Sequence, residues 1–268
     1  MSVVRDVCFA TVLIFGSVAF CSDRDDLSRA YDFQRQGSLK QARGIYESVI
    51  SRLRSTGDSV VLAGAIRRLS EVDLAEGKYA DALHHASECA ALSHKIATTA
   101  IEVDCLSVMG RAQIFSGDYP GALGTHEHAL VIAKAGNSTE DQIAFLNNLG
   151  GIYFFLGRYG DAYRSYLDAQ SLLRGHERES WHGRRQQLTL ANLAALYQQL
   201  GQYQQALDSY SQVRAMAATM RPAEQAILMT NVGTLYRRLG DPVKAIETYR
   251  QAQQLSQPAE IAMVRSAL

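Results

Sequence analysis

The sequence has 268 residues, of which 47% are hydrophobic and 20% charged, and its 27 basic residues balance its 27 acidic ones. This composition is typical of a folded protein and excludes a largely disordered chain. The balanced charge gives no reason to expect a nucleic-acid or anionic-membrane partner. Only 4 prolines occur, which favours helices over turn-rich β structure.

The first segment differs from the rest of the chain, because residues 7–20 carry no charge. This run is shorter than the ~20 residues that a membrane-spanning helix needs. It matches the apolar core of a secretory signal peptide, with 17–19 as the small-x-small cleavage signal. We predict a signal peptide at 1–19 and export to the periplasm or the extracellular space. Two alternatives remain open: a lipid anchor at Cys21, although Phe20 stands where lipoprotein signals have a small residue, and an ordinary buried first helix.

A short pattern, Gly-x-Tyr-x-x-Ala, recurs along the chain. Every copy keeps its glycine and alanine five residues apart, and successive glycines follow at steps of 40, 40, 40, 44 and 39 residues. A period of this length indicates a repeat protein. The four full copies begin at Gly77, Gly117, Gly157 and Gly201, and two degraded copies begin at Gly37 and Gly240.

Three further positions of the repeat carry residues of matching size. The residue seven positions before the glycine is small, the ninth after it is aromatic in most copies, and the twelfth after it is compact. Two antiparallel helices approach closely only where the facing residues are small, and the aromatic ring fills the space beside them. We therefore expect a helix hairpin repeated along a solenoid. The three sets are Ala30, Ser70, Gly110, Gly150, Ala194 and Gly233; Tyr46, Ala86, His126, Tyr166, Tyr210 and Tyr249; and Val49, Cys89, Ala129, Ala169, Val213 and Ala252.

The pattern predicts twelve helices in six hairpins, followed by a short tail. The tail begins at Pro258 with a sequence similar to the helix start at Pro222. We interpret 258–268 as a partial seventh repeat or a C-terminal cap. The predicted helices are 23–36 and 38–54, 58–76 and 78–96, 99–116 and 119–135, 139–156 and 159–174, 184–200 and 203–219, and 222–239 and 242–256.

These residues resemble the tetratricopeptide repeat over 22–257. The resemblance is plainest in the fourth copy, in Leu149-Gly150, Tyr153 and the run from Gly157 to Ala169. It implies an all-α, right-handed solenoid of about six hairpins. The period exceeds the usual 34 residues, as in the longer repeats of kinesin light chains. Exported bacterial proteins that join such arrays to a caspase-like CHAT peptidase domain also resemble this form.

Signs of catalysis are missing from the sequence. It contains no glycine-rich phosphate loop, no His-Glu-x-x-His, no Cys-x-x-Cys and no Gly-x-Ser-x-Gly. His84/His85 and His126/His128 are one and two residues apart, so the members of each pair point in different directions on a helix. We therefore predict no enzymatic activity, no cofactor and no metal site.

Asparagine occurs three times at one repeat position, two residues before the small packing residue, as Asn148, Asn192 and Asn231. Asparagine is a poor residue inside a helix, but its amide can bind the backbone of an extended peptide. The resemblance implies that this helix lines the concave groove, where some tetratricopeptide proteins use such a ladder. The alternative is that these amides bond to the neighbouring helix and set the repeat spacing. Nearby candidates for the same groove are Asn147, Phe155, Gln199, Arg237 and Arg238.

The sequence thus predicts an exported, non-enzymatic scaffold that binds a peptide or protein segment in its groove. Two alternatives remain: the N-terminal recognition array of a larger exported protein with a CHAT-type peptidase domain, and an outer-membrane lipoprotein scaffold. Cys89 and Cys105 lie at equal distances from the turn near residues 97 and 98, and are a candidate disulfide. Two small buried thiols are the alternative for this pair.

Overall fold

The computed structural model describes residues 23–266, and every regular element among these residues is helical. The chain divides into two compact units, Met1–Gly136 and Asn137–Leu268. The predicted signal peptide and Cys21 lie outside the described residues. The described part of the chain contains no helix that is long and apolar enough to cross a membrane.

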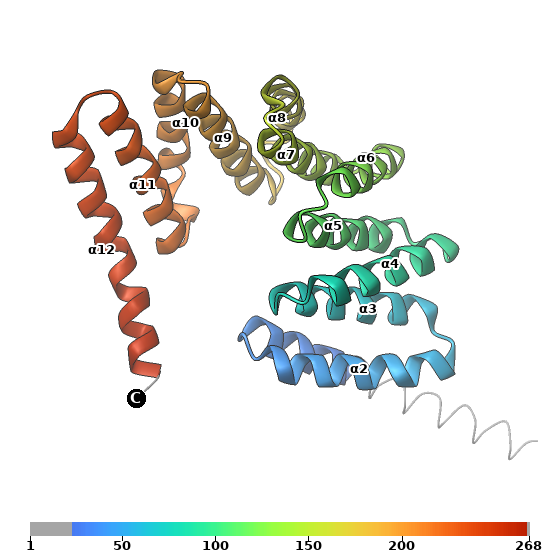
Figure 1. The fold of residues 1–268 in the computed structure, drawn as a ribbon. Helices are drawn as coiled ribbons and strands as arrows, with labels where there is room; N and C mark the ends of the chain where they lie inside the picture. The colour runs from blue at the N-terminus through green and yellow to red at the C-terminus, as the bar shows by residue number, and fades with distance from the viewer. Residues whose placement is uncertain (1–22, 267–268) are drawn as a thin grey trace, which may run out of the picture. The chain divides into compact units, whose positions relative to one another are not determined.

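The first unit is a stack of helix hairpins (Figure 1). Helices that follow one another in the chain pack together, and α3 also packs on α5, the first helix of the next hairpin. This neighbour-only packing is what a solenoid requires. The elements are a helix at 23–35, α2 (Leu39–Thr56), α3 (Ser59–Ala75), α4 (Tyr79–Lys95), α5 (Thr99–Phe115) and α6 (Tyr119–Ala135).

The second unit repeats the arrangement, with α7 packing on both α8 and α9. The prediction of an all-α solenoid is confirmed. Its elements are α7 (Thr139–Phe155), α8 (Tyr159–Leu173), α9 (His182–Gln199), α10 (Tyr203–Ala215), the 3-10 helix η1 (Ala217–Thr219), α11 (Pro222–Arg238) and α12 (Pro242–Ser266).

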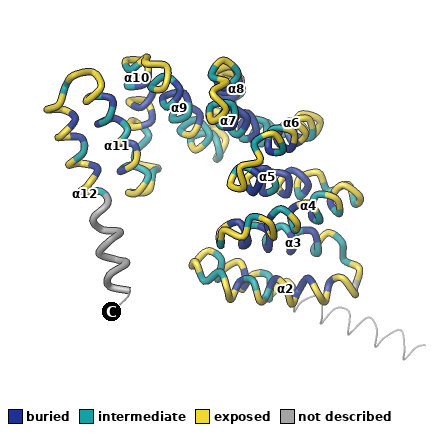
Figure 2. Tube along the Cα trace, viewed as in Figure 1, coloured by how far each residue is buried: buried dark blue, intermediate teal, exposed yellow. Residues whose placement is uncertain are grey.

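The repeated residues make the predicted packing in both units. All six motif glycines have positive φ, between 72° and 80°, a backbone conformation that costs an L residue about 1–2 kcal/mol. The motif alanines are buried, and so are the compact residues twelve positions after each glycine. Figure 2 shows the buried residues along the helix faces that meet neighbours, with the turns exposed.

The repeat position nine residues after each glycine, whose ring fills the space beside the small packing residue, is called the aromatic wedge. In the third hairpin this position is occupied by histidine. His126 is fully buried against Gly110. Burial lowers the pKa of its imidazole to about 4, because the charged form would lose its hydration. The ring is therefore neutral at neutral pH and serves as a packing residue, as tyrosine does in four of the other hairpins.

Two predicted helix boundaries are wrong. The second helix of the fifth hairpin ends at Ala215, and η1 follows within the stretch predicted as helix. The last helix, α12, continues through Pro258 to Ser266, so no separate helix begins at Pro258. Proline removes only one backbone hydrogen bond. The turns after α4 and α6 contain a residue with positive φ, Ala97 and Asn137, whereas the chain stays helical through 256–258.

A buried ion cluster that the sequence analysis missed joins the first two hairpins. Asp73 on α3 is fully buried, with its carboxylate 2.5 Å from the guanidinium of Arg43 on α2 and 2.7 Å from Nδ1 of His85 on α4. Glu76 also contacts Arg43, at 2.6 Å. The hydrogen bond from His85 to Asp73 raises the pKa of the imidazole. Three helices are thus connected by one carboxylate.

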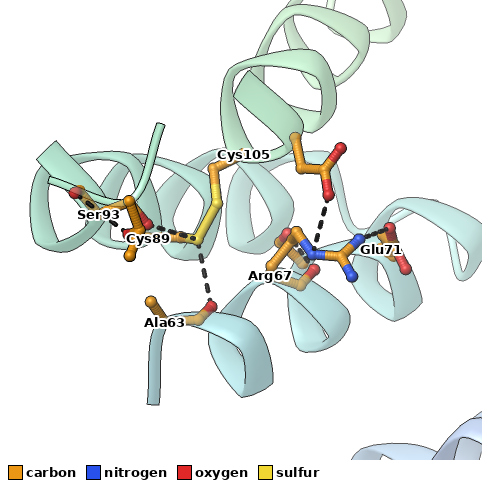
Figure 3. The surroundings of a disulfide bond; sticks show 9 residues. Ala63, Arg67, Glu71, Cys89, Ser93 and Cys105 are labelled. Atoms are coloured by element: carbon orange, nitrogen blue, oxygen red, sulfur yellow. Dashed lines mark hydrogen bonds and ion pairs between the residues drawn. A yellow bond between two sulfur atoms is a disulfide. The ribbon is translucent and has the colours of Figure 1, made fainter. Parts of the chain in front are cut away.

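Cys89 on α4 and Cys105 on α5 are joined by a disulfide, with their Cα atoms 5.9 Å apart (Figure 3). Both residues are fully buried, and Sγ of Cys89 lies 3.3 Å from the carbonyl oxygen of Ala63 on α3. The separation meets the condition that the Cα atoms lie within ~7 Å. The bond therefore links the second hairpin to the third.

Loss of this disulfide is expected to lower the free energy of unfolding by up to ~3 kcal/mol, because the disulfide closes a loop of 16 residues in the unfolded chain. The change is measured by urea unfolding of the Cys89→Ala/Cys105→Ala variant beside the oxidised chain. Thiol counting under denaturing, non-reducing conditions supplies the direct check. Two reactive thiols at these positions would show that the bridge does not form.

Candidate functional site

The candidate site lies in the second unit, on the first helices of its three hairpins, α7, α9 and α11. Asn148, Asn192 and Asn231, which we call the asparagine stripe, occupy one equivalent position on these helices, and all three are half-buried. Each asparagine amide has two N–H donors and an oxygen acceptor. The polar groups are thus neither fully enclosed nor freely solvated.

Two members of the stripe also bond to neighbouring helices. The amide of Asn192 donates to Oδ1 of Asn147 on α7, at 3.0 Å. Asn231 is hydrogen-bonded to the hydroxyl of Tyr210 on α10, whose pKa burial raises to about 12. These bonds are the ones that a spacing role requires. They use part of each amide's capacity, so a ligand-binding role for the stripe stays a prediction.

Asn148 differs from the other two. Its side-chain amide makes no hydrogen bond to any residue in the described part of the chain. A half-buried amide without an internal partner must take its hydrogen bonds from water or from a ligand. Asn148 is therefore the member of the stripe best placed to bind a ligand.

The prediction that Asn147 contacts a ligand is wrong. Its side chain is only 3% exposed, and its amide donates to the carbonyl oxygen of Ile143 and to Oγ1 of Thr189 on α9. Asn147 points into the contact between α7 and α9, because a one-residue step on a helix turns the side chain away from the face that Asn148 occupies. Its role is to join two hairpins.

The remaining candidates lie at the C-terminal ends of the first helices. Gln199 donates a hydrogen bond to the hydroxyl of Tyr159, and the guanidinium of Arg238 contacts Tyr203 at 3.4 Å. In both cases the partner is the motif tyrosine of the preceding hairpin. Arg237 is exposed, and Phe155 is 70% exposed.

The same contact is made by Tyr79 and Phe115 in the first unit, whose rings stack at 5.3 Å. The motif tyrosine thus packs against the residue that lies two positions before the glycine of the next hairpin. This explains why the pattern keeps a tyrosine at an exposed turn. It assigns Gln199 and Arg238 a part in joining hairpins, which the sequence analysis did not foresee.

Two exposed apolar residues accompany the stripe and were missed by the sequence analysis. Leu188 on α9 is 43% exposed and Ile227 on α11 is 63% exposed. Each lies four residues before an asparagine of the stripe, so each is one helical turn away on the same face. The signal was available in the sequence, as an apolar residue four positions before Asn192 and Asn231.

Comparisons with known proteins agree with this architecture. Residues 186–257 match the family model described as tetratricopeptide repeat. No curated protein matches the sequence. Among solved structures, BtubC from P. vanneervenii superposes with a TM-score of 0.71 at 19% identity, over 83% of this chain and 92% of that one.

Two other solved structures carry the same fold. A Rap protein complexed with competence and sporulation factor has a TM-score of 0.62 at 16% identity, over 87% of this chain and 74% of that one. The kinesin light chain TPR-like repeats from Podosopora anserina have a TM-score of 0.56 at 20% identity, over 78% of this chain and 97% of that one. At these identities the likeness concerns the fold. The predicted resemblance to tetratricopeptide-repeat proteins, including those of kinesin light chains, is confirmed.

Proposed function

We propose that this protein is an exported, non-enzymatic scaffold that binds an extended protein segment across α7, α9 and α11. The observation that carries the proposal is the asparagine stripe, with the unbonded amide of Asn148 and the partly used amides of Asn192 and Asn231. An extended segment exposes backbone donors and acceptors that such amides can pair with. The likeness in fold to a Rap protein solved with a bound factor supports the proposal.

The repeat geometry suits an extended chain. Packed helices lie about 8–10 Å apart, and an extended chain advances about 3.3 Å per residue. α7 packs on α9, so these two first helices meet an extended segment about every third residue. α11 is joined to α9 through the junction that contains η1 and meets the segment farther along. One side-chain amide per hairpin is enough to hold the backbone in register while other residues of the segment remain free to vary.

The test begins with selection of binders from a phage-displayed library of random dodecapeptides on the full chain. The Asn148→Ala/Asn231→Ala variant is expected to bind a selected peptide more weakly by roughly 1–3 kcal/mol, the cost of hydrogen bonds left unmade. Its melting temperature should fall slightly, because loss of the Asn231 amide leaves the hydroxyl of the buried Tyr210 without that partner. Isothermal titration calorimetry measures the first quantity and thermal unfolding the second.

Asn147→Ala is the matched control, because Asn147 is the neighbour of Asn148 on the same helix. It should reduce stability by about 1–3 kcal/mol, since it leaves buried partners unpaired. Its effect on peptide affinity should be small. Equal affinities for the double variant and the unchanged chain would contradict the proposed role of the stripe.

Export is tested separately, by mass spectrometry of the N-terminus of the protein secreted from its host. Cleavage after Ala19 gives a chain that begins at Phe20. A lipid-modified Cys21 would instead identify a lipoprotein scaffold. An intact N-terminal Met1 would contradict export by this route.

A further inference from the structure

A pocket of about 380 Å³ lies between the N-terminal halves of α9 and α11. Its volume is within the usual range for sites that take a ligand group. The residues that matter for its chemistry are Arg184, Gln187 and Leu188 on α9, Thr219 and Met220 in the junction that contains η1, and Glu224 on α11. No site is expected here from the sequence, in which the stretch up to residue 219 is predicted as helix.

The junction wall of this pocket is held in place by two glutamine amides. Gln187 on α9 donates to the carbonyl oxygen of Met216 and to Oγ1 of Thr219, at 3.1 and 2.7 Å. Gln225 on α11 donates to the carbonyl oxygens of Ala217 and Met220, at 3.0 and 3.1 Å. Both sides of the pocket thus bond to the same short segment. A wall that is already fixed costs little conformational entropy when a ligand binds.

The pocket adjoins the asparagine stripe. Leu188 contributes to its lining and lies one helical turn from Asn192, and Ile227 lies one turn from Asn231 on α11. A segment whose backbone bonds to Asn192 therefore lies one helical turn from Leu188 in the pocket lining. Leu188 and Met220 offer an apolar surface for one of its side chains.

The charges of the described residues around the pocket leave one cation for a ligand. Arg185 pairs with Glu140 at 3.0 Å, and Glu224 pairs with Arg221 at 2.7 Å. Arg184 is exposed and forms no direct ion pair with any residue between 23 and 266. The pKa of Glu224 is lowered mainly by its hydrogen bonds with Arg221 and also by the charge of Arg184, so Arg184 lies near this carboxylate without a direct bond to it. A guanidinium in this state binds a carboxylate well, since it can donate two parallel hydrogen bonds.

We propose that the pocket between α9 and α11 is a specificity subsite that takes an apolar side chain of the bound segment, with an adjacent acidic side chain on Arg184. The inference rests on the proposed function, because the stripe brings the segment to the pocket. It adds the class of segment, in which an apolar residue and an acidic residue are neighbours. The positive charge of Arg184 and the apolar lining beside it are complementary to that pair.

The experiment uses pools of degenerate, end-capped nonapeptides that differ only in a fixed central pair: Leu-Asp, Leu-Asn or Ser-Asp. Fluorescence polarisation measures the binding of each labelled pool to the full chain. The Leu-Asp pool is expected to bind about tenfold more tightly than either of the others. The Leu-Asn pool lacks the charge-assisted hydrogen bond to Arg184, and the Ser-Asp pool lacks the buried apolar side chain. Equal binding of the three pools would overturn the subsite.

Variants assign each preference to its residue. Arg184→Gln should remove the difference between Leu-Asp and Leu-Asn, and Leu188→Gln should reduce the difference between Leu-Asp and Ser-Asp. The matched controls are Arg214→Gln, an exposed arginine on α10, and Leu167→Gln, a 37% exposed leucine on α8. Both controls should keep the preferences of the unchanged chain. A preference that survives in Arg184→Gln would overturn the role of that residue.

The same pools separate failure of the subsite from failure of the proposed function. Asn148→Ala/Asn231→Ala should weaken all three pools by the same factor, because it acts on the backbone. Equal binding of the pools together with this uniform loss would overturn the subsite alone. Binding of no pool by the unchanged chain would contradict the proposed function, and the subsite with it.

Discussion

Replacement of Asp73 by asparagine is expected to lower the free energy of unfolding by about 3 kcal/mol. The carboxylate is fully buried and contacts both Arg43 and His85. The substitution keeps the shape of the side chain but removes the charge that compensates the half-buried guanidinium. The loss should be at the lower end of the range for a broken buried pair, because Glu76 still holds Arg43.

The effect should depend on pH. Asp73 raises the pKa of His85 in the folded protein, so the charged imidazole stabilises the fold below the unfolded pKa of about 6.5. This contribution is lost as the pH rises through the folded pKa of His85. The difference between the unchanged chain and Asp73→Asn should therefore be larger near pH 6 than in alkaline solution.

Urea unfolding at several pH values measures both effects, and NMR titration follows the His85 ring. Glu47→Gln is the control, since Glu47 lies 3.6 Å from the same arginine but is an exposed partner. It should have little effect at any pH. A loss of the same size for both variants would show that burial of Asp73 is not the reason.

The second large effect is expected at the aromatic wedge of the fourth hairpin. Tyr166→Ala should lower the free energy of unfolding by about 3–5 kcal/mol, because it empties a site that is only 3% exposed. Gly150→Ala should also destabilise, by about 1–3 kcal/mol. A Cβ atom at Gly150 would lie 2.4 Å from the Tyr166 ring. Gly150→Ala is thus expected to destabilise the protein, whereas Gly→Ala within a helix usually stabilises it.

The adjacent residue is a strict control for this pair. A Cβ atom at Gly151 would meet only the Tyr166 hydroxyl, at 4.0 Å, so Gly151→Ala should stabilise by up to about 1 kcal/mol. The Gly150→Ala/Tyr166→Ala variant should cost less than the sum of the single changes, by about 0.5–3 kcal/mol. The second hairpin has this combination of small residues in Ser70 and Ala86, both buried. Strict additivity in urea unfolding would contradict the wedge.

The class of fold was predictable because six hairpins need the same residue types at the same helix contacts. Gly157 needs positive φ, and Ala162 and Ala169 must be small where two helices meet. These requirements are local to one hairpin and are readable as residue types at fixed spacing. Most helix bounds were predictable on the same grounds, and those near η1 and Pro258 were not.

The site was predictable only in part, since a repeat position does not specify toward which neighbouring helix a side chain points. Asn147 and Asn148 are neighbours in the sequence, but one is buried between α7 and α9 and the other makes no bond within the described part of the chain. Gln199 and Arg238 looked like groove residues, and their tyrosine contacts appear only when the next hairpin is packed beside them.

The sequence by itself therefore determined the hairpin, its period and the residues at its helix contacts, because these depend on size and backbone conformation. The tertiary structure decided what depends on neighbours far along the chain. It brought Asp73 between Arg43 and His85. It also placed the junction that contains η1 between α9 and α11, where two glutamine amides hold it and leave a pocket. Some of these contacts join positions 30 or more residues apart, as between Arg43 and Asp73 and between Gln187 and Thr219, and no local pattern records them.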